Sequence, residues 1–76
     1  MNQNIEQFFV DLKNLVEKQS YAPSVREVME ASSMASVSKT YDYLNELRLN
    51  GLIHWEVGKN RTLVLTEKGK VFMRDE

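Results

Sequence analysis

The stretch from Tyr21 to Gly51 constrains the fold more than any other part of the chain. A proline two residues after Tyr21 ends any preceding helix, because proline disfavours helical geometry in the residue before it. Ser24 and Glu27 have the spacing of a capping box, which predicts a short helix that ends near Ala31. A serine-rich segment and a longer segment of helical periodicity follow without a linker. Two helices joined by a tight turn predict a helix-turn-helix, whose second helix can enter a DNA groove.

The turn is expected at residues 32–36, where serines can bond neighbouring backbone groups and then cap the next helix. That helix is expected from Val37 to about Leu49, and Gly51 is a natural stop for it. Both helices should bury one face. The expected inner residues are Val25, Val28 and Met29 in the first helix and Val37, Thr40, Leu44 and Leu47 in the second.

An amphipathic helix is expected before this segment, over residues 4–19. Asn4 can cap it, with Gln7 three residues later. Its apolar positions fall on one face, and we interpret that face as core rather than as a surface for a partner helix, because so short a domain has few apolar residues. The apolar positions are Ile5, Phe8, Phe9, Leu12, Leu15 and Val16.

A hairpin is expected after it. Residues 53–57 alternate in polarity, residues 58–61 have turn chemistry, and residues 62–66 are rich in β-branched side chains. Thr66 should then cap a loose helical turn. Three helices followed by a two-stranded hairpin predict a mainly α fold, the winged helix-turn-helix, as a single domain over residues 1–76.

The composition excludes several kinds of site. The chain has no cysteine and one histidine, so neither a disulfide, a thiolate metal site nor a histidine cluster can form. His54 has no acid, base or metal partner in register, and we interpret it as structural or exposed. No apolar run is long enough to span a membrane, and no export signal is recognisable at the N-terminus. We therefore expect a cytoplasmic protein without enzymatic activity, and no metal, cofactor, membrane or small-molecule substrate as a partner.

The charge balance is unusual for a nucleic-acid-binding domain. Ten basic residues face eleven acidic ones, which gives a net charge of −1, whereas most DNA-binding domains are basic. Any affinity for DNA must therefore come from the local placement of charges rather than from a field over the whole surface.

The second helix of the motif carries the candidate base-reading residues. Ser36 and Ser38 can bond phosphates or bases, and the positive end of the helix dipole lies beside them. Lys39 can donate to a guanine edge or a phosphate, and Asp42 can accept from a cytosine amino group. Tyr41 lies on the boundary of this face. The alternative is that these residues only form the solvated side of an amphipathic helix. Asp42 and Glu46 are the weak points of the base-reading interpretation, because unpaired carboxylates beside phosphates are repelled.

Candidate contacts to the DNA backbone lie elsewhere. The expected hairpin tip carries Lys59, Asn60 and Arg61, where a wing can touch the sugar–phosphate chain and position the protein without reading sequence. Arg26, near the start of the first motif helix, is a further candidate for a phosphate. A basic tip is also common in proteins that bind no nucleic acid. Trp55 is interpreted as core between the hairpin and the helices.

Several of these motifs together resemble a known family. Tyr21-x-Pro23-Ser24-Val25-Arg26-Glu27-Val28, then Met34-Ala35-Ser36-x-Ser38, then Leu44-x-x-Leu47-x-x-x-Gly51-Leu52-Ile53 is similar to the N-terminal DNA-binding domain of LexA repressors, and most similar to the Gram-positive branch. The likeness is continuous from about Tyr21 to Ile53 and looser to Leu65. It implies a repressor-type domain that reads an operator half-site, with base-reading positions at Ser36, Ser38, Lys39, Tyr41 and Asp42 and a supporting wing.

Two departures from the family pattern matter. LexA-like chains usually have Leu-Gly where this chain has Ser32-Ser33, so Ser33 has to adopt a strained conformation or the turn has to change. The family's self-cleaving and dimerising domain is also missing from this sequence. We therefore expect a small regulator of phage or plasmid type, which works as a homodimer or beside another regulatory protein.

Two functions remain open. The first is a sequence-specific, non-enzymatic regulator that binds double-stranded DNA and acts as a repressor. The second is a winged-helix module that binds a protein, such as a host repressor or RNA polymerase, and this alternative fits the near-neutral charge and the acidic residues of the third helix.

Overall fold

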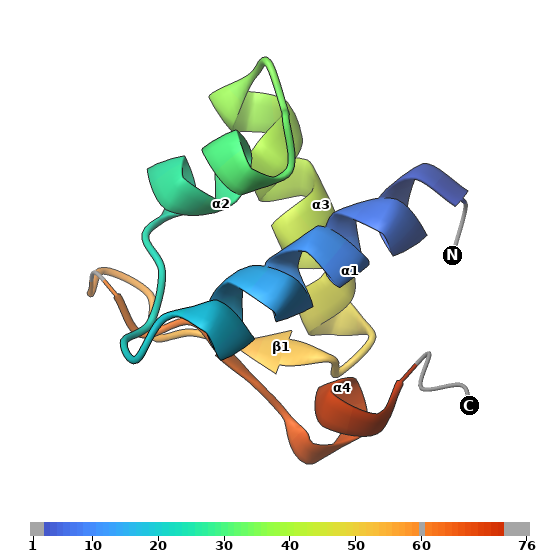
Figure 1. Ribbon diagram of the computed structural model, residues 1–76, viewed down its shortest axis with the longest axis vertical. Coiled ribbons are helices and arrows are strands. Elements are labelled where there is room, and N and C mark those ends of the chain that lie inside the picture. The colour runs from blue at the N-terminus through green and yellow to red at the C-terminus, as the bar shows by residue number, and fades with distance from the viewer. Residues whose placement is uncertain (1–2, 60, 73–76) are drawn as a thin grey trace.

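The computed structural model describes residues 3–59 and 61–72, apart from the side chain of Gln3. The order of the elements confirms a mainly α winged helix-turn-helix with a two-stranded antiparallel sheet (Figure 1). In chain order they are α1 (Gln3–Lys18), α2 (Val25–Ala31), α3 (Val37–Leu49), β1 (Ile53–His54), β2 (Val64–Leu65) and α4 (Glu67–Val71). In Figure 1, α1 crosses α3, with α2 near one end of α3 and β1 near the other.

One apolar cluster joins the helices to the sheet. The expected stripe of α1 supplies four buried residues, and Leu15 and Val16 pack against them at the edge. Burial of one large apolar side chain stabilises the folded state by about 1.5–3 kcal/mol, so this cluster is the main stabilising term in so small a domain. The buried apolar residues are Ile5, Phe8, Phe9, Leu12, Val28, Leu44, Leu47, Leu52, Ile53 and Leu63.

The predicted helix starts and stops are mostly confirmed. The Ser24 hydroxyl accepts from the Glu27 amide at 3.1 Å, and the Glu27 carboxylate accepts from the Ser24 amide at 3.0 Å, which completes the capping box. Ser36 caps α3, and Thr66 caps the short α4. Gly51 ends α3 with a left-handed φ of +77°. Such caps satisfy backbone groups that the helices leave unpaired, at about 1 kcal/mol each.

The start of α1 differs from expectation. The helix begins at Gln3, so Asn4 lies inside the first turn and does not cap it. Gln7 does not reach back to the cap either, because its side-chain amide donates to Asp11 at 3.1 Å.

The inner face of the motif is confirmed with one exception. Val28, Thr40, Leu44 and Leu47 are buried, and Val25 packs against the core. Met29 is only half-buried. Val37 was expected inside but is 49% exposed, because the whole first turn of α3 extends beyond the core and Thr40 is its first covered residue.

The strands of the wing, residues 53–65, are shorter than the alternation of residues 53–57 predicts. Among the described residues of the wing, strand pairing is limited to Ile53 with Leu65 and His54 with Val64. Beyond them the Glu56 amide donates to the Thr62 hydroxyl at 2.8 Å, so a side chain replaces the strand ladder. Val57, the last apolar residue of this alternation, is consequently 78% exposed.

The turn before α3 contains the strain that its sequence predicts. Ser33 has a φ of +58°, and the Ser32 hydroxyl donates to the Val28 carbonyl at 2.7 Å. A residue other than glycine in this left-handed region costs roughly 1–2 kcal/mol.

We expect Ser33→Gly to raise the free energy of unfolding by about 0.5–1 kcal/mol, because relief of this strain exceeds the extra chain entropy that glycine loses. Gly58 is the matched control, because it has a φ of +84° and open space where a Cβ would lie. Gly58→Ala should lower stability by a similar amount. Urea unfolding of both variants measures the effect. Equal or lower stability of Ser33→Gly would contradict the strain.

Candidate nucleic-acid interface

The N-terminal half of α3 exposes every predicted base-reading residue. The inner positions Thr40 and Leu44 are buried. Because successive helical residues are rotated by about 100°, positions on the opposite side of the helix face solvent. The structure places the predicted five, Ser36, Ser38, Lys39, Tyr41 and Asp42, on this exposed side. Their role in reading bases stays a prediction.

Two of these residues have contacts within the domain. The Ser36 hydroxyl accepts from the Lys39 amide at 3.2 Å as it caps the helix, which leaves its O–H able to donate to a ligand. The Lys39 ammonium lies 5.8 Å from the centroid of the Tyr43 ring, and Tyr43 packs edge-on against Phe8. The Lys39 ammonium is therefore directed toward the Tyr43 ring, on the side of α3 that packs against α1.

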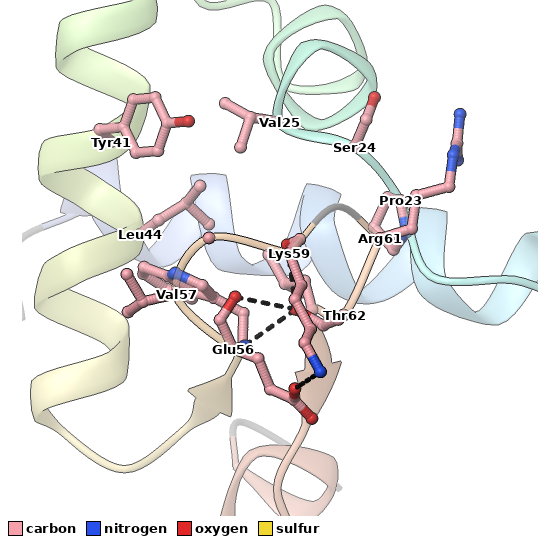
Figure 2. A pocket seen from close by; sticks show the side chains of 13 residues that line it. Pro23, Ser24, Val25, Tyr41, Leu44, Glu56, Val57, Lys59, Arg61 and Thr62 are labelled. Atoms are coloured by element: carbon pink, nitrogen blue, oxygen red, sulfur yellow. Dashed lines mark hydrogen bonds and ion pairs between the residues drawn. The ribbon is translucent and has the colours of Figure 1, made fainter.

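A hollow of about 430 Å³ lies between α3, the start of α2 and the wing (Figure 2). It brings together residues that are far apart in the chain: Tyr41 from α3 borders it opposite Lys59 and Arg61 from the wing. Apolar and polar residues both line its walls. The lining residues are Pro23, Ser24, Val25, Tyr41, Leu44, Trp55, Glu56, Val57, Gly58, Lys59, Arg61, Thr62 and Leu63.

Two of the predicted backbone contacts lie in exposed, weakly held positions. The Lys59 ammonium is 3.3 Å from the Glu56 carboxylate, and Arg26 lies 4.0 Å from Glu30. Exposed pairs of this kind contribute about 0–1 kcal/mol, so both cations can exchange their carboxylate for a phosphate at little cost. Asn60, the third predicted contact, lies outside the described residues.

Arg61 is placed differently from the sequence-based expectation. Its two terminal nitrogens donate to the two carboxylate oxygens of Glu27 at 3.0 and 3.1 Å, and one of them also donates to the Ala22 carbonyl at 3.2 Å. The guanidinium lies 5.3 Å from the centroid of the Tyr21 ring. In Figure 2 the side chain runs past Pro23 and away from Tyr41. Arg61 thus points to the α1–α2 connection instead of outward from the tip.

This arrangement controls the charge of Glu27. Hydrogen bonds from Arg61 and from the Ser24 amide lower the pKa of Glu27 from its ordinary value of 4.5 to about 2. The same contact raises the pKa of Arg61. The sequence predicted the capping role of Glu27 but not its pairing with Arg61 of the wing. Opposite charge was the only signal, and 34 residues separate the partners.

The wing is also held at its base. Trp55, interpreted as core, packs partly buried against the apolar cluster, and the Arg48 guanidinium of α3 lies 4.6 Å from the centroid of its ring. His54 is exposed, as expected. Over residues 3–59 and 61–72, no three acidic or histidine side chains are placed to hold a metal ion, and no helix has the length and apolarity to cross a membrane.

The low pKa of Glu27 predicts a pH effect on stability. Its carboxylate stabilises the folded state fully above pH 4.5, and this contribution is lost as the pH falls toward 2, because the proton binds more tightly in the unfolded chain. Glu27→Gln should therefore lose less stability than the wild type between these values, as measured by urea unfolding at successive pH. Glu30→Gln, which changes a long and exposed pair, should follow the wild type. An identical acid response of Glu27→Gln and wild type would contradict the assignment.

Comparison with known proteins agrees with this geometry. A family model of the LexA DNA binding domain matches residues 5–62. The LexA repressor of Acetivibrio thermocellus is 34% identical over 76 residues, 100% of this chain and 36% of the relative. Those of Clostridium kluyveri and Oenococcus oeni are 32% and 38% identical, over 91% and 76% of this chain and 34% and 29% of their own. The chain spans about a third of the length of these curated relatives. Its motif, wing and sequence place it in the LexA DNA-binding domain family.

Proposed function

We propose that the chain binds double-stranded DNA with sequence preference and acts as a transcriptional repressor, with α3 in the major groove. The observation that carries the proposal is the exposed N-terminal half of α3, whose opposite side is fixed in the core by Thr40, Leu44 and Leu47. The family match over residues 5–62 supports it. The proposed activity is binding without catalysis, at DNA in the cytoplasm.

The chemistry of α3 fits base edges and phosphates. The major groove admits one helix, and its edges offer acceptors on guanine and donors on cytosine. Lys39 donates to guanine or to a phosphate, and Asp42 accepts from a cytosine amino group. The Ser36 and Ser38 hydroxyls donate hydrogen bonds beside the positive end of the helix dipole, where a phosphate is favoured. In the proposed complex, Tyr41 faces the DNA strand that passes along the hollow.

The wing and α2 supply contacts that do not read sequence. Lys59 borders the same hollow as Tyr41, and its exposed ammonium can reach the sugar–phosphate chain beside the groove that α3 occupies. Arg26 on α2 binds a second phosphate. Neither residue distinguishes one base pair from another.

One domain covers one half-site, so we propose that two copies bind together on a two-fold related operator. Two half-sites on one face of the duplex, one helical turn or a multiple of it apart, would let both α3 helices enter the major groove. Titration of duplexes with one half-site and with two tests this stoichiometry.

Replacement of Lys39 and replacement of Lys59 by alanine should change DNA binding in different ways. Lys39→Ala should lose about 1–3 kcal/mol of preference for a selected duplex over a random one, because a base-reading donor is gone. Lys59→Ala should weaken both duplexes alike and reduce the slope of log K against log salt by about 0.9, since one phosphate contact is lost. Fluorescence anisotropy over a salt series measures both. Equal losses on both duplexes for Lys39→Ala would remove its base-reading role.

A protein-binding module is the second candidate. The net charge of −1 and the exposed Asp42 and Glu46 on α3 favour it, since these carboxylates repel phosphates. Under this alternative, the wild type causes no gel shift of random or genomic duplex fragments even at low salt. A purified repressor or polymerase instead changes the elution of the wild type in gel filtration.

A further inference from the structure

The wing has few backbone bonds to hold its position. Each of its strands has two residues, and a hairpin of this size is marginally stable by itself. The wing nevertheless forms one wall of the hollow beside α3, so its placement decides where Lys59 lies relative to the proposed DNA site. Side-chain contacts must therefore supply the constraint that the short sheet lacks.

Among the described residues of the wing, Arg61 makes the side-chain hydrogen bonds of longest sequence range. Its three hydrogen bonds all end on the α1–α2 connection and on the first turn of α2, 34 to 39 residues away in sequence. The backbone of Arg61 has a left-handed φ of +58°, a strained value that the surrounding contacts must maintain. A cation that served only as a mobile phosphate ligand would need neither the bond to the Ala22 carbonyl nor this backbone geometry.

Glu27 is the point at which helix start and wing meet. One carboxylate oxygen accepts from the Ser24 amide, from the Gln19 side chain and from Arg61, and the other accepts from the second terminal nitrogen of Arg61. Most exposed ion pairs contribute little, but a bidentate arginine–carboxylate pair is the exception, because its two parallel bonds fix both groups. The pair is also partly covered, with side-chain exposures of 47% for Arg61 and 30% for Glu27.

We propose that Arg61 is a positioning residue of the DNA site: its bidentate pair with Glu27 fixes the wing on the first turn of α2 and so holds Lys59 beside α3. Arg61 raises DNA affinity through this placement and without touching a phosphate. The inference rests on the proposed function.

The direction of one effect separates this role from a phosphate contact. Glu27→Gln keeps a side chain that can complete the capping box but removes the ion pair. If Arg61 positions the wing, the variant binds a selected duplex several-fold more weakly than the wild type, although it has lost a negative charge. If Arg61 binds phosphate, loss of the competing carboxylate strengthens binding. Glu30→Gln on the same helix is the matched control, and its identical charge change should leave affinity unchanged or slightly raised.

Arg61→Lys gives a second comparison. Lysine keeps the charge but cannot form the two parallel bonds, so the positioning role predicts a loss close to that of Arg61→Ala. A phosphate contact through charge alone predicts that Arg61→Lys retains most of the affinity. Anisotropy titrations with one selected duplex at one salt concentration compare all four variants.

A measurement without DNA keeps the inference testable by itself. Trp55 is the single tryptophan, and it lies at the base of the wing. Acrylamide should quench its fluorescence more efficiently in Glu27→Gln and Arg61→Ala than in the wild type, whereas Glu30→Gln should match the wild type. If the wild type binds no duplex, the proposed function fails. The quenching of Trp55 fluorescence then tests by itself whether Arg61 positions the wing. Unchanged quenching, or tighter DNA binding by Glu27→Gln, would overturn the inference.

Discussion

The contact between α1 and α3 is the constraint on which the rest of the domain depends. Phe8, Phe9 and Leu12 of α1 share one apolar cluster with Leu44 and Leu47 of α3, and burial of these side chains fixes the rotation of α3 about its own axis. This rotation decides which residues face solvent, because each side chain points in a fixed direction around the helix axis. The polar residues Ser38, Lys39 and Asp42 are therefore exposed as a result of core packing.

The net charge does not show how the individual charges of the domain are paired. Each predicted backbone cation among the described residues lies beside a carboxylate, but the pairs differ: those of Lys59 and Arg26 are single and exposed, whereas that of Arg61 is bidentate and partly covered. Exchange of a carboxylate for a phosphate is easy for the first two and costly for the third. A nearly neutral domain can thus keep cations for DNA while its remaining charges hold the fold. Lys39 differs again, since an aromatic ring supports it.

The features that sequence predicts well are those set by neighbouring residues. The capping box of Ser24, the cap at Ser36 and the stop at Gly51 depend on residues a few positions apart, and the structure has each of them. One local prediction, the cap at Asn4, is wrong because α1 begins at Gln3. The other errors concern tertiary contacts. Alternation predicted a longer strand over residues 53–57, but strand length depends on the opposite strand, where the Thr62 hydroxyl replaces the ladder. For the candidate site, sequence identified the exposed residues of α3 but could not show where Arg61 points.

The position of Arg61 connects two parts of the domain that sequence treats as separate. The carboxylate of Glu27 completes the start of α2 and also receives the wing, so the helix start and the wing share one group. A disturbance of either part is transmitted to the other, because loss of the wing contact leaves Glu27 with fewer donors and loss of the cap moves the carboxylate that Arg61 requires. The two walls of the hollow, α2 and the wing, therefore keep a fixed relation to each other. The third wall, α3, is set by the core, and together these constraints give the surface its shape before any ligand arrives.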